Sequence, residues 1–378
     1  MSNVAYQILN TAARKGAGLQ RPLILAIVAL AVLLFTVISY SWTKGHSLHN
    51  LHNRLVRPST FESEVHNSTL GFQEVFYISM PYRTDRQDAM NLLASMSDVQ
   101  LKLIPGVRGE DVHEKARPDG SNLKPSALGC WRAHVDTWRH IIENNIQTAL
   151  ILEDDIDWDV NLKQILSKVS NQMKTNTALR LEPESEWEKY STPYGSDWDL
   201  LFLGQCLDLA PPHLRSDLKI IYDDEDVPSL DQTAHNFRQM LRSLNVTGDD
   251  IGKKRVITPS WGPACTMGYG VTRRGAQRLL LNLSYLGLRG PVDNDMAWTF
   301  QDGKLRGYSV NPPIFNPWRV GGQKDSDNFT PNSDQSIEGS GNKAGSSSNI
   351  KNSARKALVN ALALNNWADY ERTNEVKE

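Results

Sequence analysis

Cysteine is scarce in this chain: its 378 residues include only Cys130, Cys206 and Cys265. None of the three has the spacing of a cysteine pair that binds zinc, which argues against a zinc site built on thiolates. Three cysteines are also too few for a small scaffold held together by disulfides, and a chain of this length does not need one. One disulfide can form within the chain, and the sequence leaves its two partners open.

An excess of either charge is also lacking. The 41 lysines and arginines nearly match the 43 aspartates and glutamates, which leaves a net charge of −2. Composition therefore does not favour nucleic acid as a partner. No internal repeat is found. Hydrophobic residues make up 40% of the chain, enough to bury the core of one large domain or two smaller ones.

One long apolar run is present, at residues 22–43, and it contains no charged residue. About 20 apolar residues are needed to span a bilayer, so the run is predicted to be a transmembrane helix. A cleaved signal peptide has a shorter apolar core of about 7–15 residues, although the small residues at 39–41 leave cleavage open.

The orientation of this helix is predicted from acceptor sites for N-glycosylation, because basic residues nearly balance on its two sides. Such sites occur at Asn67, Asn245, Asn282 and Asn328. They favour a globular part in the secretory lumen. The chain is therefore predicted to be a single-pass type II protein of the Golgi or endoplasmic reticulum membrane, with residues 1–21 in the cytosol.

Beyond the anchor, residues 44–72 are predicted to form a stem and 73–330 the globular domain. Residues 331–353 are rich in Ser, Gly and Asn and are predicted to be disordered. Ser353 is a suitable cap for a final helix within 354–378.

Strands and helices alternate within the globular domain, and no period is found in residues 208–250, which are predicted to be an irregular insertion. Expected strands are 74–78, 99–104, 149–152, 199–203 and 267–271; expected helices are 83–97, 127–144, 163–179 and 272–283. This alternation predicts an α/β fold with a mainly parallel, doubly wound sheet flanked by helices.

The strand at 149–152 leads directly into a cluster of carboxylates. They are Glu153, Asp154, Asp155, Asp157 and Asp159. Such a cluster is costly to bury unless it is paired or holds a cation. At the carboxyl end of a strand it faces the crevice where α/β proteins bind ligands. Hard oxygen ligands there suit Mn²⁺ or Mg²⁺ shared with a substrate diphosphate; a solvated loop is the alternative.

Several blocks occur in an order that resembles glycosyltransferase family 25, the group of lipopolysaccharide-biosynthesis enzymes and collagen galactosyltransferases. The blocks are residues 75–80 followed by Arg83 and Arg86, Gly-Cys…His at 129–134, Leu-Glu-Asp-Asp at 152–155, the weaker 198–204, and 265–280 followed by Pro-Val-Asp at 291–293. The chain departs from the family pattern at Leu128, at Ala133, where Ser is common, and at Asn316.

The resemblance implies a GT-A type fold and transfer of a sugar from a nucleotide-sugar, usually with inversion. UDP-galactose is the favoured donor, and a glycan or glycoprotein is the acceptor. Glu153 to Asp155 would take the role of the Asp-x-Asp motif of such enzymes. Asp155 is then the expected ligand of Mn²⁺ or Mg²⁺, and Glu153 and Asp154 are expected to contact the donor. Asp157 is a reserve ligand, with a solvated position or capping of the next helix as the alternative.

An inverting transfer also needs a general base for the acceptor hydroxyl. Asp293 and Asp295 are the candidates, with capping of the following helix as the alternative for Asp293. Arg83 and Arg86 follow the first strand and can bind phosphate, or they are solvated. His134 is a donor contact or a core residue.

Two other classes of protein compete with the transferase. A non-catalytic lumenal binding protein on the same fold is permitted by the departures from the family pattern, although the acid cluster argues against it. A metal-dependent hydrolase needs a second set of metal ligands, and no convincing set is found in the sequence.

Overall fold

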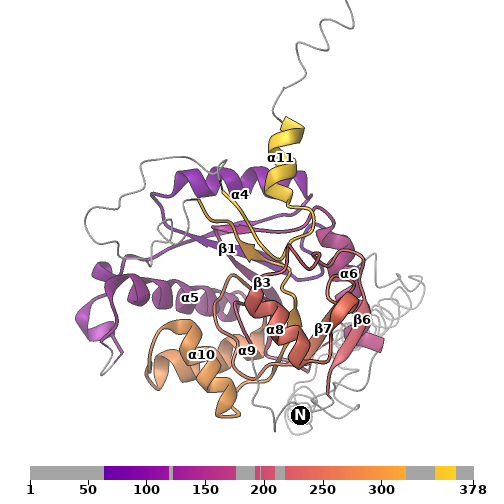
Figure 1. Ribbon diagram of the computed structural model, residues 1–378. Helices are drawn as coiled ribbons and strands as arrows, with labels where there is room; N and C mark the ends of the chain where they lie inside the picture. The colour runs from indigo at the N-terminus through magenta and orange to yellow at the C-terminus, as the bar shows by residue number, and fades with distance from the viewer. Residues whose placement is uncertain are drawn as a thin grey trace, which may run out of the picture. The chain divides into compact units, whose positions relative to one another are not determined.

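The computed structural model describes residues 64–118, 122–175, 192–195, 197–208, 218–320 and 345–362. Contacts within the chain separate Met1–Ser59 from Thr60–Glu378, and all described residues belong to the second unit (Figure 1). The predicted cytosolic tail and the predicted anchor at 22–43 lie outside the described residues. In the described part of the chain, no helix combines the length and the apolar character needed to cross a bilayer.

A mixed sheet of eight strands organises the described residues. Its order is β2 (Lys102–Pro105), β1 (Glu74–Ser79), β3 (Thr148–Glu153), β8 (Gly268–Thr272), β5 (Leu200–Gly204), β9 (Gly307–Asn311), β7 (Lys254–Pro259) and β6 (Ile220–Asp223). β1 pairs in parallel with β2 and β3, and β5 with β9. β8 and β7 are antiparallel to both of their neighbours. The prediction of a mainly parallel sheet is therefore confirmed, since the other strands all run in one direction. It is wrong for β7 and β8, which run in the opposite direction.

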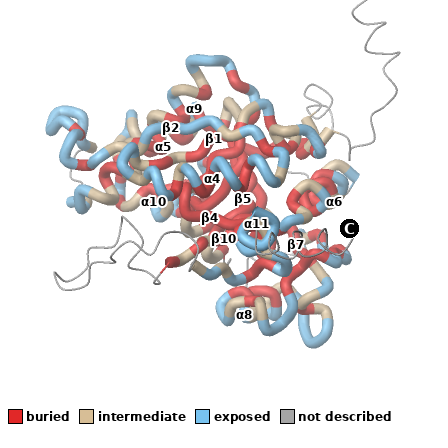
Figure 2. Tube along the Cα trace, turned by 90° about the horizontal axis from the view of Figure 1, so that it is seen from above, coloured by how far each residue is buried: buried red, intermediate tan, exposed pale blue. Residues whose placement is uncertain are grey.

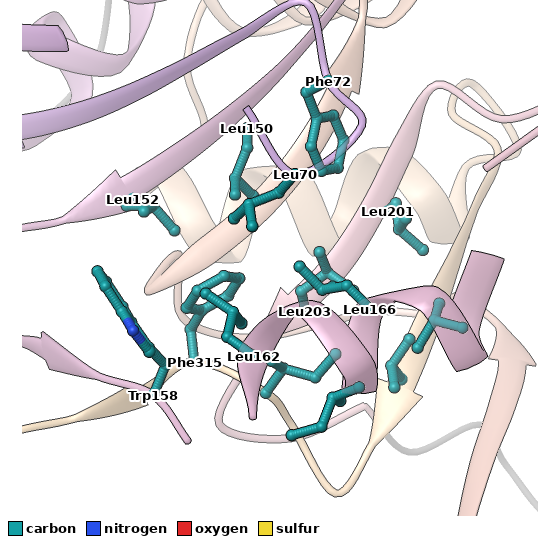
Figure 3. Packing of buried hydrophobic residues seen from close by; sticks show 14 of the residues in the cluster. Leu70, Phe72, Leu150, Leu152, Trp158, Leu162, Leu166, Leu201, Leu203 and Phe315 are labelled. Atoms are coloured by element: carbon teal, nitrogen blue, oxygen red, sulfur yellow. The ribbon is translucent and has the colours of Figure 1, made fainter. Parts of the chain in front are cut away.

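Both faces of the sheet are buried, because the middle positions of β1, β3 and β5 are apolar. Along β1 and β3, Val75, Tyr77, Leu150 and Leu152 pack on one face, and Phe76, Ala149 and Ile151 on the other. The first face is covered by α4 (Thr84–Met96) and α6 (Leu162–Thr175), and the second by α5 (Pro125–Glu143), α9 (Arg273–Leu280) and α10 (Val292–Gln301). Figure 2 shows buried strands inside exposed helix surfaces, and Figure 3 shows the first core.

The prediction of an irregular insertion at 208–250 is wrong for its described part. That part contains β6 and α8 (His235–Ser243), which buries Phe237, Met240 and Leu241. β7 and β9 were not predicted either. These strands have four to six residues, too few for a period to stand out in the sequence.

The predicted disordered segment at 331–353 needs a correction as well. Residues 331–344 lie outside the described residues, whereas 345–353 pack against the domain. Asn349 and Ile350 are buried, and Asn349 Oδ1 accepts a hydrogen bond from the backbone of Ala234 at 2.8 Å. Composition indicated disorder because polar side chains that satisfy buried groups look the same in sequence as solvated ones. The segment leads into α11 (Ala354–Leu362).

Two very short strands complete the description. β4 (Ile156–Asp157) pairs antiparallel with β10 (Asn316–Pro317), apart from the main sheet. β4 follows the acid cluster directly. The pairing therefore joins the region of the cluster to a segment about 160 residues later in the chain.

Candidate active site

A cavity of about 1010 Å³ lies at the carboxyl edge of the sheet. β1, β3 and β5 end there, and β8 begins there because it runs in the opposite direction. Ser79, Glu153, Cys206 and Thr266 line the cavity from or just beyond these strand ends. This is the edge at which α/β sheets bind ligands.

Asp154 is buried at one wall of this cavity and has two partners. Its Oδ2 accepts a hydrogen bond from Ser79 Oγ at 2.6 Å, and its Oδ1 accepts one from Arg86 Nη1 at 2.7 Å. Burial raises the pKa of Asp154, and the Arg86 guanidinium opposes that rise. The carboxylate thus holds Arg86 in place, and Arg86 also lines the cavity.

Asp155 has one satisfied and one unsatisfied oxygen. Its Oδ2 pairs with Arg319 Nη1 and lies 3.5 Å from Arg86 Nη2. Its Oδ1 is buried and has no hydrogen-bond partner. A buried carboxylate oxygen without a partner is costly, and the atom belongs to a residue that lines the cavity. Asp155 is therefore the side chain best placed to take a ligand.

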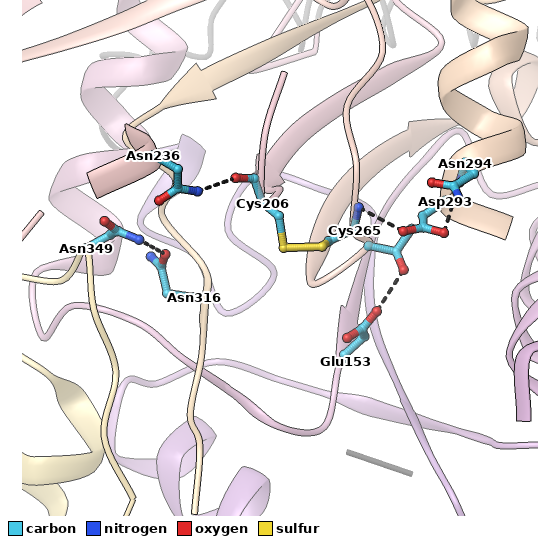
Figure 4. The surroundings of a disulfide bond; sticks show 9 residues. Glu153, Cys206, Asn236, Cys265, Asp293, Asn294, Asn316 and Asn349 are labelled. Carbon is cyan, nitrogen blue, oxygen red and sulfur yellow. Dashed lines mark hydrogen bonds between the residues drawn. A yellow bond between two sulfur atoms is a disulfide. The ribbon is translucent and has the colours of Figure 1, made fainter. Parts of the chain in front are cut away.

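Glu153 completes the acid cluster. Thr266 Oγ1 donates a hydrogen bond of 2.7 Å to Glu153 Oε1 (Figure 4). Burial, and secondly the negative charge of Asp155, raise the pKa of Glu153 to about 7. A divalent cation bound beside it would favour the ionised form.

The carboxylates of residues 153–155 do not form a ready-made cage for a metal ion. Among the described residues, the group of acids whose oxygens lie together is Asp224, Glu225 and Asp226. Lys168 Nζ already lies 2.9, 2.6 and 3.1 Å from these three carboxylates. At the cavity, the unpartnered oxygen of Asp155 fits a Mg²⁺-like ion that takes one or two carboxylates and completes its shell with water and substrate phosphate.

Asp157, the predicted reserve ligand, has a structural role instead. It is fully buried and does not line the cavity. Its Oδ1 accepts hydrogen bonds from the backbone of Trp158 at 2.9 Å and Arg355 at 3.1 Å, and its Oδ2 accepts one from Ser353 Oγ at 2.5 Å. Asp157 therefore stabilises the start of α11, because its oxygens satisfy groups of that turn.

The two candidate bases are separated by the structure. Asp293 lines the cavity, and its Oδ2 accepts a hydrogen bond from the backbone of Cys265 at 3.2 Å (Figure 4). Asp295 is buried and accepts hydrogen bonds from Arg289 Nε at 2.6 Å and from the Arg289 backbone at 2.8 Å. Asp295 does not line the cavity. Both lie in the first turn of α10, whose cap is Pro291, so the capping alternative for Asp293 is wrong.

Of the remaining predicted residues, one lines the cavity and one does not. Arg83 pairs with Asp85 at 2.9 Å and does not line the cavity. His134 lines it and is buried, with Nδ1 2.9 Å from the Tyr269 hydroxyl. Burial lowers the pKa of His134 to about 4, so the ring is neutral at pH 7. Six predicted residues thus share one cavity: Arg86, His134, Glu153, Asp154, Asp155 and Asp293.

The sequence assigned no role to three side chains of the site and left the partners of the disulfide open. Arg319 belongs to no motif, and Thr266 and Ser79 lie inside family blocks without a predicted role. The disulfide between Cys206 and Cys265 joins the end of β5 to the turn before β8. With three cysteines the sequence could indicate at most one bridge, and only the strand order shows which pair is close.

The disulfide is expected to stabilise both the fold and the candidate base. It closes a loop with a sequence separation of 59. Replacing both cysteines by alanine is expected to lower the free energy of unfolding by about 3 kcal/mol and the melting temperature by roughly 5–10 °C. Thermal unfolding of C206A/C265A measures this, with C130A as the control. A double variant that melts with the wild type would contradict it.

Comparison with known proteins gives the fold and site a family context. Residues 72–194 match the family described as glycosyltransferase family 25 (LPS biosynthesis protein). The match covers about a third of the chain, and this part of the chain is similar to glycosyltransferase family 25. The matched range contains Arg86 and residues 153–155, whereas Asp293 and Arg319 lie beyond it.

Curated relatives extend the similarity over more of the chain. Procollagen galactosyltransferase 1-B of Xenopus laevis is 24% identical over 281 residues, which cover 68% of this chain and 37% of the relative. Procollagen galactosyltransferase 1 of Danio rerio is 22% identical, over 72% of this chain and 41% of the relative. The chain thus spans less than half the length of these relatives.

One further relative carries a different description. Inactive glycosyltransferase 25 family member 3 of Homo sapiens is 27% identical over 154 residues, which cover 36% of this chain and 22% of the relative. Similarity to this family is therefore not sufficient to establish activity.

Proposed function

We propose that this chain is a family 25 glycosyltransferase of GT-A type, which moves a sugar from a nucleotide-sugar to a hydroxyl group of a glycan or protein. The observation that carries the proposal is Asp155, whose buried Oδ1 lacks a partner at the end of β3. The surrounding cavity of about 1010 Å³ is at the upper end of the range for small-molecule sites, which suits a ligand as large as a nucleotide-sugar.

Charge on the leaving diphosphate is the main problem that the site has to solve. A Mn²⁺ or Mg²⁺ ion held by Asp155 would supply a Lewis acid that neutralises this charge. Arg86 and Arg319, both beside Asp155, are suited to bind the phosphate oxygens through pairs of N–H groups. Glu153 and neutral His134 offer hydrogen bonds that orient the donor in the cavity.

Asp293 is the proposed general base. Its carboxylate lines the cavity, and the Cys265 N–H holds one of its oxygens in place. In an inverting transfer, Asp293 takes the proton of the acceptor hydroxyl as that oxygen attacks the sugar carbon. The diphosphate then leaves from the opposite face.

The proposed donor is UDP-galactose and the proposed acceptor a glycan or glycoprotein, because two of the relatives are named procollagen galactosyltransferases. The proposed location is the lumen of the Golgi or endoplasmic reticulum, with residues 22–43 as a type II anchor. The Cys206–Cys265 disulfide supports this location, since disulfides persist in oxidising compartments.

A non-catalytic binding protein is the second candidate, because one relative is named inactive. Such a protein would keep the cavity and its affinity for a nucleotide-sugar but would not break the sugar–phosphate bond. Binding and turnover therefore have to be measured separately.

A panel of nucleotide-sugars tests the proposed function. The full chain in detergent and its Thr60–Glu378 unit are incubated with each donor and Mn²⁺, and both thermal shift and release of nucleoside diphosphate are recorded. We expect UDP-galactose to stabilise the protein and to be turned over, and EDTA to remove turnover. Stabilisation without turnover, with acceptor glycans present, would favour the binding protein; no response to any donor would contradict both.

A further inference from the structure

The segment 345–356, here called the C-terminal strap, packs behind the acid cluster rather than in the cavity. It lies beyond the range that matches the family, and none of its residues lines the cavity. Figure 1 shows α11 beside α4, and the two helices are in contact. In Figure 2 the start of α11 lies over β4 and β10.

Arg355 joins the strap to the turn that carries Asp155. Only 4% of Arg355 is exposed. Its Nε donates a hydrogen bond of 2.7 Å to the carbonyl oxygen of Ile156, and its Nη2 donates one of 3.2 Å to the carbonyl oxygen of Asp154. The guanidinium carbon lies 5.8 Å from the ring centroid of Trp318. One side chain thus fixes the backbone on both sides of Asp155.

The strap also fixes the segment that carries Arg319, the ion-pair partner of Asp155. The backbones of Ser346 and Arg319 exchange two hydrogen bonds of 2.9 Å. Ser347 Oγ donates to the carbonyl oxygen of Pro317 at 3.0 Å, and Asn349 Nδ2 donates to Asn316 Oδ1 at 3.1 Å (Figure 4). Because the guanidinium of Arg319 pairs with Asp155, the strap holds both members of this ion pair.

Two acids of the cluster serve the strap itself. Asp157 accepts hydrogen bonds from Ser353 and from the Arg355 backbone. Asp159 Oδ2 accepts one from the backbone of Asn352 at 2.7 Å, and the Ala354 N–H donates to the carbonyl oxygen of Trp158 at 2.8 Å. The cluster therefore has two sides: residues 153–155 face the cavity, and Asp157 and Asp159 bind the strap.

We propose that the C-terminal strap is a positioning element of the active site, and that Arg355 is the residue on which this positioning depends. Its effect on turnover rests on the proposed function. Arg355 contacts backbone carbonyls rather than substrate, so it acts through Asp155 and Arg319. Groups that orient a metal ligand in this way typically change affinity or activity by about 10–100-fold when they are replaced.

The test compares Arg355→Met with a matched control, Arg255→Met. Arg255 is equally buried and pairs with Asp224 at 2.6 Å, and it does not line the cavity. Both variants are expected to melt below the wild type. R355M is expected to lower kcat by about 10–100-fold and to speed amide hydrogen exchange at residues 153–158. R255M is expected to keep kcat within about twofold, and Arg355→Lys to recover part of the loss.

Each other outcome has a distinct meaning. If R355M melts lower but keeps the kcat of R255M, the strap is merely structural and the proposal is overturned. If R355M does not fold, Asn349→Ala and R355K carry the same comparison from two positions of the strap. If the wild type turns over no donor, the proposed function fails, but hydrogen exchange still decides: unchanged exchange at 153–158 in R355M overturns the positioning role.

Discussion

Asp155→Asn is expected to lower kcat for sugar transfer by at least about 1000-fold, or about 4 kcal/mol of transition-state stabilisation. The amide keeps the shape of the carboxylate but removes its charge. A cation at the unpartnered Oδ1 position then faces a neutral amide instead of a charged carboxylate. Arg86 keeps its pair with Asp154, so the cavity wall is expected to remain folded.

Donor turnover and Mn²⁺ titration measure the effect of Asp155→Asn. Asp302→Asn is the control, since Asp302 lies outside the cavity in an exposed pair with Arg289, and it is expected to act like the wild type. The apparent Mn²⁺ affinity of D155N is expected to fall together with kcat. A D155N protein that keeps more than a tenth of wild-type turnover would remove Asp155 from the proposed metal site.

Asp155 could be predicted from the sequence because a local pattern carries the information. The apolar run at 149–152 indicates a buried strand, and the acid that follows such a strand reaches the ligand-binding edge of the sheet. The structure agrees: Glu153, Asp154 and Asp155 line one cavity. The local pattern places the acid cluster at this edge, whereas the choice of Asp155 among these acids came from the resemblance to the family.

Asp157 shows where that local reasoning ends. It is two residues from Asp155 and has the same side chain, yet its oxygens bind Ser353 and the start of α11. The partner lies 196 residues away in the chain, in a segment whose composition indicated disorder. A sequence pattern cannot distinguish an acid that binds a ligand from one that satisfies a distant backbone.

The direction of β8 is the other feature that the sequence did not indicate. In a purely parallel sheet, the residues that precede a strand lie at the opposite edge from the ligand. β8 is antiparallel to β3 and β5, so Cys265 and Thr266, just before it, reach the same edge as Glu153. The disulfide with Cys206 fixes this turn, and the Cys265 N–H then reaches Asp293. The proposed base is thus positioned by a strand reversal.

Asp293→Asn is the second variant with a large expected effect. Loss of a positioned general base typically costs about 10²–10⁴ in rate, and an amide in place of Asp293 cannot take the acceptor proton. We expect kcat for transfer to fall within this range, while the affinity for the nucleotide-sugar changes little. Steady-state transfer kinetics and nucleotide-sugar binding of D293N measure these two quantities separately.

Asp295→Asn is the matched control for that variant. Asp295 is the same residue type as Asp293 and lies two positions later in the same helical turn. Asp295, however, is buried against Arg289 rather than in the cavity. We expect D295N to lower the free energy of unfolding by about 1–2 kcal/mol and to keep kcat close to the wild type. The loss of stability is limited because Arg289, the partner of Asp295, is partly exposed. Normal kcat in D293N together with loss of turnover in folded D295N would reverse the assignment, because the two carboxylates differ chiefly in which of them reaches the cavity.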